Sequence, residues 1–153
     1  MLKSTFALFG SLAVALAFAP TAVADDSIMF RTMSGKMRCF ASSNEPSRGG
    51  GPLAVCETYA QETDGAFPQA PLINYAPGSS DRANIVMVND RGQLSWDIGD
   101  IPGMNSPQDT VMEYGKTYRS DGWTISAGSD GTRLTNQRTG HGMFVSIDNV
   151  YSF

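Results

Sequence analysis

Apolar and polar residues alternate in short runs along most of the chain after residue 25. In the run at residues 36–41, Met37, Cys39 and Ala41 occupy every second position, so we expect them to share an inward-facing side of a strand. Gly, Pro, Asn, Asp and Ser separate the runs, and no segment after residue 25 keeps apolar positions at helical spacing for three turns. The pattern therefore predicts an all-β domain.

The runs predict about eight short strands joined by tight turns. The candidate runs, nine if the one broken at Gly115 is included, lie at residues 28–33, 36–41, 53–59, 83–88, 93–98, 111–118 (broken at Gly115), 122–127, 132–136 and 142–147. Residues 89–92 (Asn-Asp-Arg-Gly) suit a hairpin turn, and the last three strands suit a meander. We expect loops at residues 42–52 and 99–109, and at residues 62–82 a long irregular connection whose prolines form a contact surface. This arrangement is typical of a small antiparallel sandwich or a partly open barrel.

The first 24 residues have the features of a secretory signal peptide. Lys3 provides a basic start, residues 6–19 are apolar, and Ala22-Val23-Ala24 places small residues where a signal peptidase requires them. A membrane anchor is the alternative, but a run of roughly 14 apolar residues is shorter than the ~20 that cross a bilayer. We therefore expect a signal helix in residues 1–24, removed after Ala24, and a single secreted β domain in residues 25–153.

The charge balance excludes some partners. The 153-residue chain carries 11 basic and 15 acidic side chains, a formal net charge of −4. No cluster of Lys or Arg is visible in the sequence, so we expect no nucleic-acid partner and no stable membrane insertion after signal cleavage. The expected location is extracellular or associated with the cell envelope.

Cys39 and Cys56 are the only two cysteines. An even pair in an exported domain favours a disulfide, here between two neighbouring strands. A thioredoxin-like redox pair would place the two sulfurs closer in sequence, and a zinc site would need more Cys or His nearby. The sequence therefore predicts a structural disulfide between Cys39 and Cys56.

No set of catalytic residues stands out. His141 is the one histidine, but Gly140 and Gly142 flank it in a predicted turn, and no nucleophile motif accompanies it. Asp97 and Asp100 could serve as paired carboxylates, yet with 15 acidic residues some close pair is expected by chance. We therefore assign no catalytic, cofactor-binding or metal-binding residue, expect no cofactor, and favour a non-enzymatic domain.

The aromatic residues offer binding surface, although most are expected in the β core or half-buried on strands. They are Tyr59, Tyr75, Trp96, Tyr114, Tyr118, Trp123 and Tyr151. The first functional hypothesis is a binding module for a protein or glycan of the envelope. Two alternatives stay open: a small secreted hydrolase that uses acidic residues converging in a cleft, and a structural or inhibitory partner of another secreted protein.

Several motifs resemble a family of small secreted actinobacterial, mycobacterial-type proteins that form a domain of unknown function. The motifs lie at residues 30–39 (FRTMSGKMRC), 54–57 (AVCE), 113–116 (EYGK), 131–136 (GTRLTN) and 139–144 (TGHGMF). The resemblance spans nearly all of residues 25–153 and implies export, but no particular activity. Members tend to carry further cysteines, one at the place of Leu134 and one near Ile125, so we expect this chain to replace a second bridge with a facing apolar pair.

Overall fold

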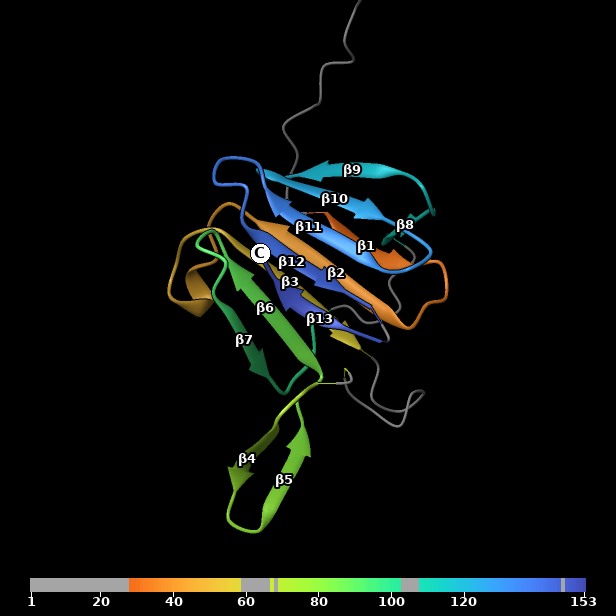
Figure 1. The fold of residues 1–153 in the computed structure, drawn as a ribbon. Coiled ribbons are helices and arrows are strands. Elements are labelled where there is room, and N and C mark those ends of the chain that lie inside the picture. Colours follow the sequence, from red (N-terminus) through yellow and green to blue (C-terminus); the bar gives the residue numbers. More distant parts are fainter. Residues whose placement is uncertain (1–27, 59–66, 68, 103–107, 147) are drawn as a thin grey trace, which may run out of the picture.

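A computed structural model describes residues 28–58, 67, 69–102, 108–146 and 148–153. These residues form thirteen β-strands and one short 3₁₀ helix, η1 (Pro46–Arg48), and the described part contains no α-helix. The strands make two sheets packed face to face and a separate two-stranded hairpin (Figure 1). The predicted all-β class is confirmed, and the sandwich is not closed into a barrel.

The first sheet has six strands in the order β7-β6-β3-β2-β1-β8. Their bounds are β1 Met29–Thr32, β2 Met37–Ser42, β3 Leu53–Thr58, β6 Ile85–Asn89, β7 Leu94–Asp97 and β8 Thr110–Met112. All neighbours are antiparallel except β1 and β8, which pair in parallel at the sheet edge. The predicted hairpin around residues 89–92 is confirmed as β6–β7.

The second sheet is a five-stranded antiparallel meander in the order β13-β12-β11-β10-β9. Its strands are β9 Thr117–Ser120, β10 Trp123–Ala127, β11 Thr132–Asn136, β12 Gly142–Val145 and β13 Val150–Ser152. The three-stranded meander predicted for the C-terminal third is therefore confirmed, with one more strand on each side. Ile125 and Leu134 lie directly opposite each other and are fully buried. They form the facing apolar pair that we expect in place of a second disulfide.

The main core lies between the two sheets. Met37, Cys39 and Ala41 are buried there, as the alternating pattern predicts, and the Cys39–Cys56 disulfide joins β2 and β3 across a directly opposed pair. Trp123 is the largest fully buried side chain, and its indole Nε1 donates to the Ser42 carbonyl at 3.1 Å. That bond links β10 to β2, so the two sheets are tied by a polar contact as well as by apolar packing.

A smaller apolar cluster covers the outer side of the six-stranded sheet. It consists of Val55, Ile85, Met87 and Ile101. Ile101 belongs to the segment that the sequence predicts as a loop, and the described part of residues 99–109 contains neither strand nor helix. Ile101 lies against the outer side of the sheet, where it packs with outward-facing residues of β3 and β6 that are also buried.

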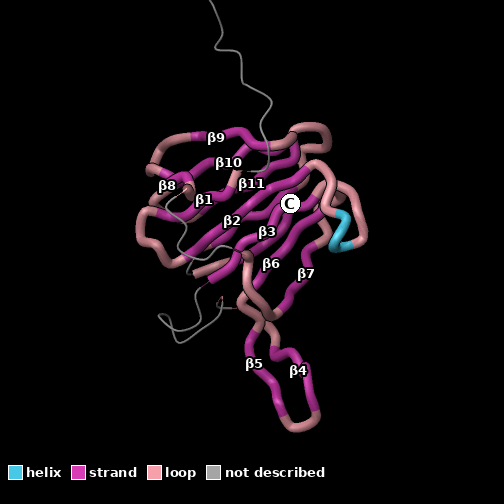
Figure 2. The backbone as a smooth tube through the Cα atoms, turned by 180° about the vertical axis from the view of Figure 1, so that it is seen from behind, coloured by secondary structure: helices cyan, strands magenta, loops and turns pink. Residues whose placement is uncertain are grey.

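Strands β4 (Leu72–Ala76) and β5 (Ser79–Arg82) form a hairpin that extends away from the sandwich (Figures 1 and 2). The prediction of an irregular connection through residue 82 is wrong here. Pro77 and Gly78 form the turn, with Gly78 at φ 77°. Nearly every position of the hairpin faces solvent, so the sequence carries no inward apolar alternation that would reveal two strands.

The strand count of about eight is too low because several strands have only three or four residues. The single predicted strand at residues 111–118 is two strands, β8 and β9, which belong to different sheets. Gly115, at φ 79°, lies between them. The predicted signal peptide lies outside the described residues, and no helix among those residues is long and apolar enough to cross a membrane.

Candidate binding site

A pocket of about 430 Å³ opens at one end of the sandwich, between the two sheets. It is bordered by the β1–β2 turn, the last residue of β3, strand β8, the β10–β11 turn and the end of β12. The β1–β2 and β10–β11 turns lie at the right-hand end of the molecule in Figure 1. The volume falls within the range of about 300–1,000 Å³ that small-molecule sites occupy.

The interior of the pocket is mostly apolar. Five of its buried lining residues are apolar and one is polar: Met37, Phe67, Met112, Ala127 and Val145 are the apolar ones, and Thr132 is the polar one. Two of the five are methionines, whose unbranched side chains adjust to irregular shapes. An apolar ligand group that covers this surface would therefore bind favourably, because it removes apolar area from contact with water.

The mouth of the pocket is polar and rich in hydroxyl groups. Its more exposed lining residues are Ser34, Lys36, Tyr114, Ser129, Asp130 and Ser146. Tyr114 has 53 % of its surface exposed, which places a half-apolar, half-polar side chain at the entrance. The pocket as a whole thus has an apolar interior and a hydrogen-bonding mouth.

Thr58 adds an unusual feature to this lining. It ends β3 opposite Met37, and its amide donates to the Asn84 carbonyl at 2.9 Å. Its hydroxyl Oγ1, however, is buried and has no hydrogen-bond partner among the described residues. An unsatisfied buried polar atom costs about 1–3 kcal/mol, so this hydroxyl is a donor or acceptor for a bound molecule that reaches it through a shift of the side chains covering it.

The tight β10–β11 turn shapes one side of the mouth. In the β10–β11 turn the Gly128 amide donates to the Gly131 carbonyl at 2.8 Å, and Gly131 adopts a φ of 152°. A side chain at Gly131 would meet the Phe144 ring and the Val145 carbonyl. Glycine is therefore required there by both conformation and space.

A buried polar cluster lies elsewhere, on the outer side of the six-stranded sheet. The Arg38 guanidinium donates to both Asp109 carboxylate oxygens, at 2.6 and 2.8 Å, and to the carbonyls of Ile101 and Pro102. Glu57, opposite Arg38, accepts from the Ile101 amide at 2.8 Å. These bonds hold Ile101, Pro102 and Asp109 on the sheet, and none of the charged residues of the cluster lines the pocket.

Burial, with a smaller contribution from the nearby Asp100 carboxyl that hydrogen-bonds to Glu57, raises the pKa of Glu57 to about 7, although the hydrogen bond from the Ile101 amide lowers it. The hydrolase hypothesis requires two carboxylates that meet in a cleft. Glu57 and Asp100 do meet, but on the outer side of the six-stranded sheet, whereas Asp130 is the one carboxylate among the described residues of the pocket lining.

Asp97 and Asp100 have different partners. Asp97 accepts from Arg48 at 2.8 Å, and this hydrogen bond lowers the pKa of the Asp97 carboxyl. Asp100 instead interacts with Glu57. The two aspartates that the sequence singles out are therefore engaged in separate contacts.

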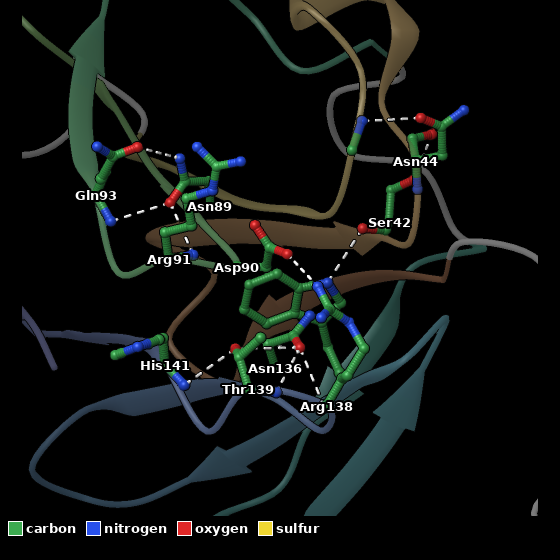
Figure 3. A network of polar contacts seen from close by, with 12 residues as sticks. Ser42, Asn44, Asn89, Asp90, Arg91, Gln93, Asn136, Arg138, Thr139 and His141 are labelled. Atoms are coloured by element: carbon green, nitrogen blue, oxygen red, sulfur yellow. Dashed lines mark hydrogen bonds and ion pairs between the residues drawn. The ribbon is translucent and has the colours of Figure 1, made fainter.

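His141 lies at the opposite side of the sandwich from the pocket mouth, in the β11–β12 turn. Its amide donates to the Thr139 hydroxyl, and Asn136 accepts from Thr139 within the same turn (Figure 3). In the described part of the chain the polar partner of the imidazole is the Phe153 carbonyl, 3.2 Å from Nδ1. The turn also carries Arg138, which forms an ion pair with Asp90 of the β6–β7 turn (Figure 3). These contacts agree with a structural role in joining the two sheets.

The sequence does not identify the pocket. Its lining comes from segments between residues 32 and 146, and a buried unpaired threonine has no sequence signature. The predicted contact surface of residues 62–82 contributes Phe67 to the described lining.

Three of the tyrosines are more exposed than expected: Tyr75, Tyr114 and Tyr151. Tyr59 lies outside the described residues.

The described residues contain no group of three or more His, Cys, Asp or Glu side chains placed to hold a metal ion. No curated protein and no solved structure matches this chain. A family model, described as a family of unknown function (DUF6636), matches residues 10–153. Since that match covers most of its length, the chain belongs to this family of unknown function.

Proposed function

We propose that this chain is a secreted, non-enzymatic binding module and that the pocket takes a small amphipathic molecule. The signal-like residues 1–24 and the Cys39–Cys56 disulfide support export. The resemblance to small secreted proteins of actinobacteria supports the same location, at or outside the cell envelope.

The observation that carries this proposal is a mostly apolar pocket interior beside the buried Thr58 hydroxyl, which has no hydrogen-bond partner among the described residues. A ligand with an apolar body and one polar group would cover the methionine and phenylalanine surface and complete the hydrogen bonding of Thr58. At about 30 Å³ for a water-sized group, the pocket has room for on the order of 14 non-hydrogen atoms. A medium-length alkyl chain with a polar head has this size.

Binding accounts for the arrangement better than hydrolysis does. Glu57 and Asp100 meet on the outer side of the six-stranded sheet, outside the pocket, and His141 contacts Phe153 at another part of the sandwich. An acid–base mechanism needs such groups within hydrogen-bond reach of the reacting bond. Binding requires only the shape, the apolar interior and the hydroxyl that the pocket already has.

Titration calorimetry with 1-decanol and decanoate tests the proposal. We expect saturable binding with a stoichiometry of one, and loss of binding in Ala127→Leu, whose larger side chain occupies the pocket. Ala76→Leu makes the same change on the exposed face of the β4–β5 hairpin and should bind as the unaltered protein does. Equal binding by Ala127→Leu, or no binding of either probe, would contradict the proposal.

A further inference from the structure

The outer side of the five-stranded sheet carries a continuous row of outward-facing residues. The pairing register places Tyr151 opposite Phe144, Phe144 opposite Arg133, Arg133 opposite Ser126, and Ser126 opposite Thr117. The row crosses all five strands, a distance of about 19 Å at the usual strand spacing. It is long enough to contact a short extended chain.

One end of the row is an aromatic platform. The Phe144 and Tyr151 rings stack with centroids 5.2 Å apart, and Tyr151 keeps 43 % of its surface exposed. Beside them the Arg133 guanidinium lies 3.5 Å from the centroid of the Phe153 ring. These contacts fix the aromatic and guanidinium planes before any ligand arrives, so little conformational entropy is lost on binding.

The charge on this sheet is opposite to that of the whole chain. The chain has a formal net charge of −4, yet strands β9 to β13 contain no acidic residue. Arg119 and Arg133 are exposed on its outer side, and neither takes part in the ion pairs found among the described residues. Thr124 and Thr135 add hydroxyl groups on the same side of the sheet. Thr124 lies opposite Arg119 on β9 and opposite Thr135 on β11.

We propose that this outer face binds an acidic glycan, a polymer of uronic-acid type. A sugar ring stacks on Tyr151, carboxylates of the chain pair with Arg133 and Arg119, and sugar hydroxyls bond to Ser126 and Thr117. Stacking and charge-assisted hydrogen bonds together select a ligand that has both apolar ring faces and spaced negative charges. This surface is separate from the pocket and does not depend on the function proposed for it.

The small number of cationic side chains on this face favours a glycan over nucleic acid. Nucleic-acid affinity comes mainly from many Lys and Arg contacts to a dense row of phosphates, and this face has two arginines on an acidic chain. A glycan with one carboxylate on each sugar, or on every second sugar, needs fewer cations and gains from the aromatic platform.

The test measures binding of the purified protein to immobilised polygalacturonate, with dextran as the neutral polymer and single-stranded DNA as a second polyanion. We expect binding to polygalacturonate that weakens at high salt, and none to dextran. Arg119→Gln and Arg133→Gln should each weaken binding about tenfold, the usual effect of losing a charge-assisted hydrogen bond. Tyr151→Ala should also weaken it.

Matched controls separate this face from general charge and aromatic effects. Arg91→Gln removes a positive charge from the exposed β6–β7 turn, and Tyr75→Ala removes an exposed tyrosine from β4; both should leave binding unchanged. Circular dichroism confirms that each variant is folded. The inference is overturned if polygalacturonate does not bind, if the controls lose as much affinity as the outer-face variants, or if DNA binds more tightly than the glycan.

Discussion

Arg38 and Glu57 lie directly opposite each other on β2 and β3, one position before and after the disulfide-bonded pair Cys39 and Cys56. Successive residues of a strand point to opposite sides, so the disulfide faces the core and the charged pair faces Ile101, Pro102 and Asp109. The same two strands therefore stabilise the sandwich on one side and hold a covering segment on the other.

Glu57 makes stability depend on pH. Burial raises its pKa from 4.5 to about 7, so between these pH values the folded protein keeps a proton that the unfolded chain releases. The free energy of unfolding should fall by about 3 kcal/mol as the pH rises through this range, and the full contribution is present below it. Urea unfolding at several pH values should show that the free energy of unfolding depends less on pH in Glu57→Gln than in the unaltered protein. An unchanged slope in this variant would assign the dependence to other groups.

Arg38 should be essential for stability. Arg38→Met leaves the Asp109 carboxylate buried and without its bidentate partner, which should lower the free energy of unfolding by about 3–5 kcal/mol. Arg48→Met removes the partly exposed ion pair with Asp97 and should cost about 1 kcal/mol or less. Chemical denaturation of both variants measures the difference. Similar losses would mean that the buried pair contributes no more than a surface pair.

The disulfide should act as a structural link and not as a redox centre. Replacing Cys39 and Cys56 with alanine removes a bond between residues 17 positions apart and should lower stability by about 3 kcal/mol. The β-sheet signal in circular dichroism should persist because both strands keep their other pairings. Thermal unfolding at the temperature of the unaltered protein would show that the link contributes nothing.

A second cross-strand disulfide should form in the facing sheet. Gly128 and Gly131 exchange both backbone hydrogen bonds, so the alternation along the hairpin makes Ile125–Leu134 a non-hydrogen-bonded pair, whose Cα atoms lie close. We expect Ile125→Cys with Leu134→Cys to oxidise without added catalyst. Thiol titration and mass spectrometry of the unreduced protein detect the bond. Two free thiols after air oxidation would show that the opposed pair lacks the required geometry.

Alternation and turn chemistry in the sequence predict the inward face of β2, the β6–β7 hairpin and the C-terminal meander. Each of these elements buries one side, and a strand with one buried side has alternating apolar and polar residues. The β4–β5 hairpin is missed because it buries almost nothing, and the parallel pairing of β8 with β1 is missed because it joins segments about 80 residues apart without a local signal.

The site is less visible in sequence than the fold. Arg38 and Glu57 appear as ordinary polar positions of alternating strands, although both are fully buried under a segment that only the tertiary structure places there. Thr58 likewise ends a strand as many threonines do. The significance of its hydroxyl depends on which atoms surround it, and these come from several distant parts of the chain.

The most direct test of the binding proposal is the free energy of unfolding of Thr58→Val, measured with and without saturating 1-decanol. Valine has nearly the same shape and removes the unpartnered hydroxyl. Without ligand the variant should be more stable by about 1 kcal/mol, because an unsatisfied buried group is gone. With ligand it should gain less stability than the unaltered protein does, because the bound molecule loses its hydrogen bond. A variant that is no more stable alone and is stabilised equally by the ligand would contradict the role assigned to Thr58.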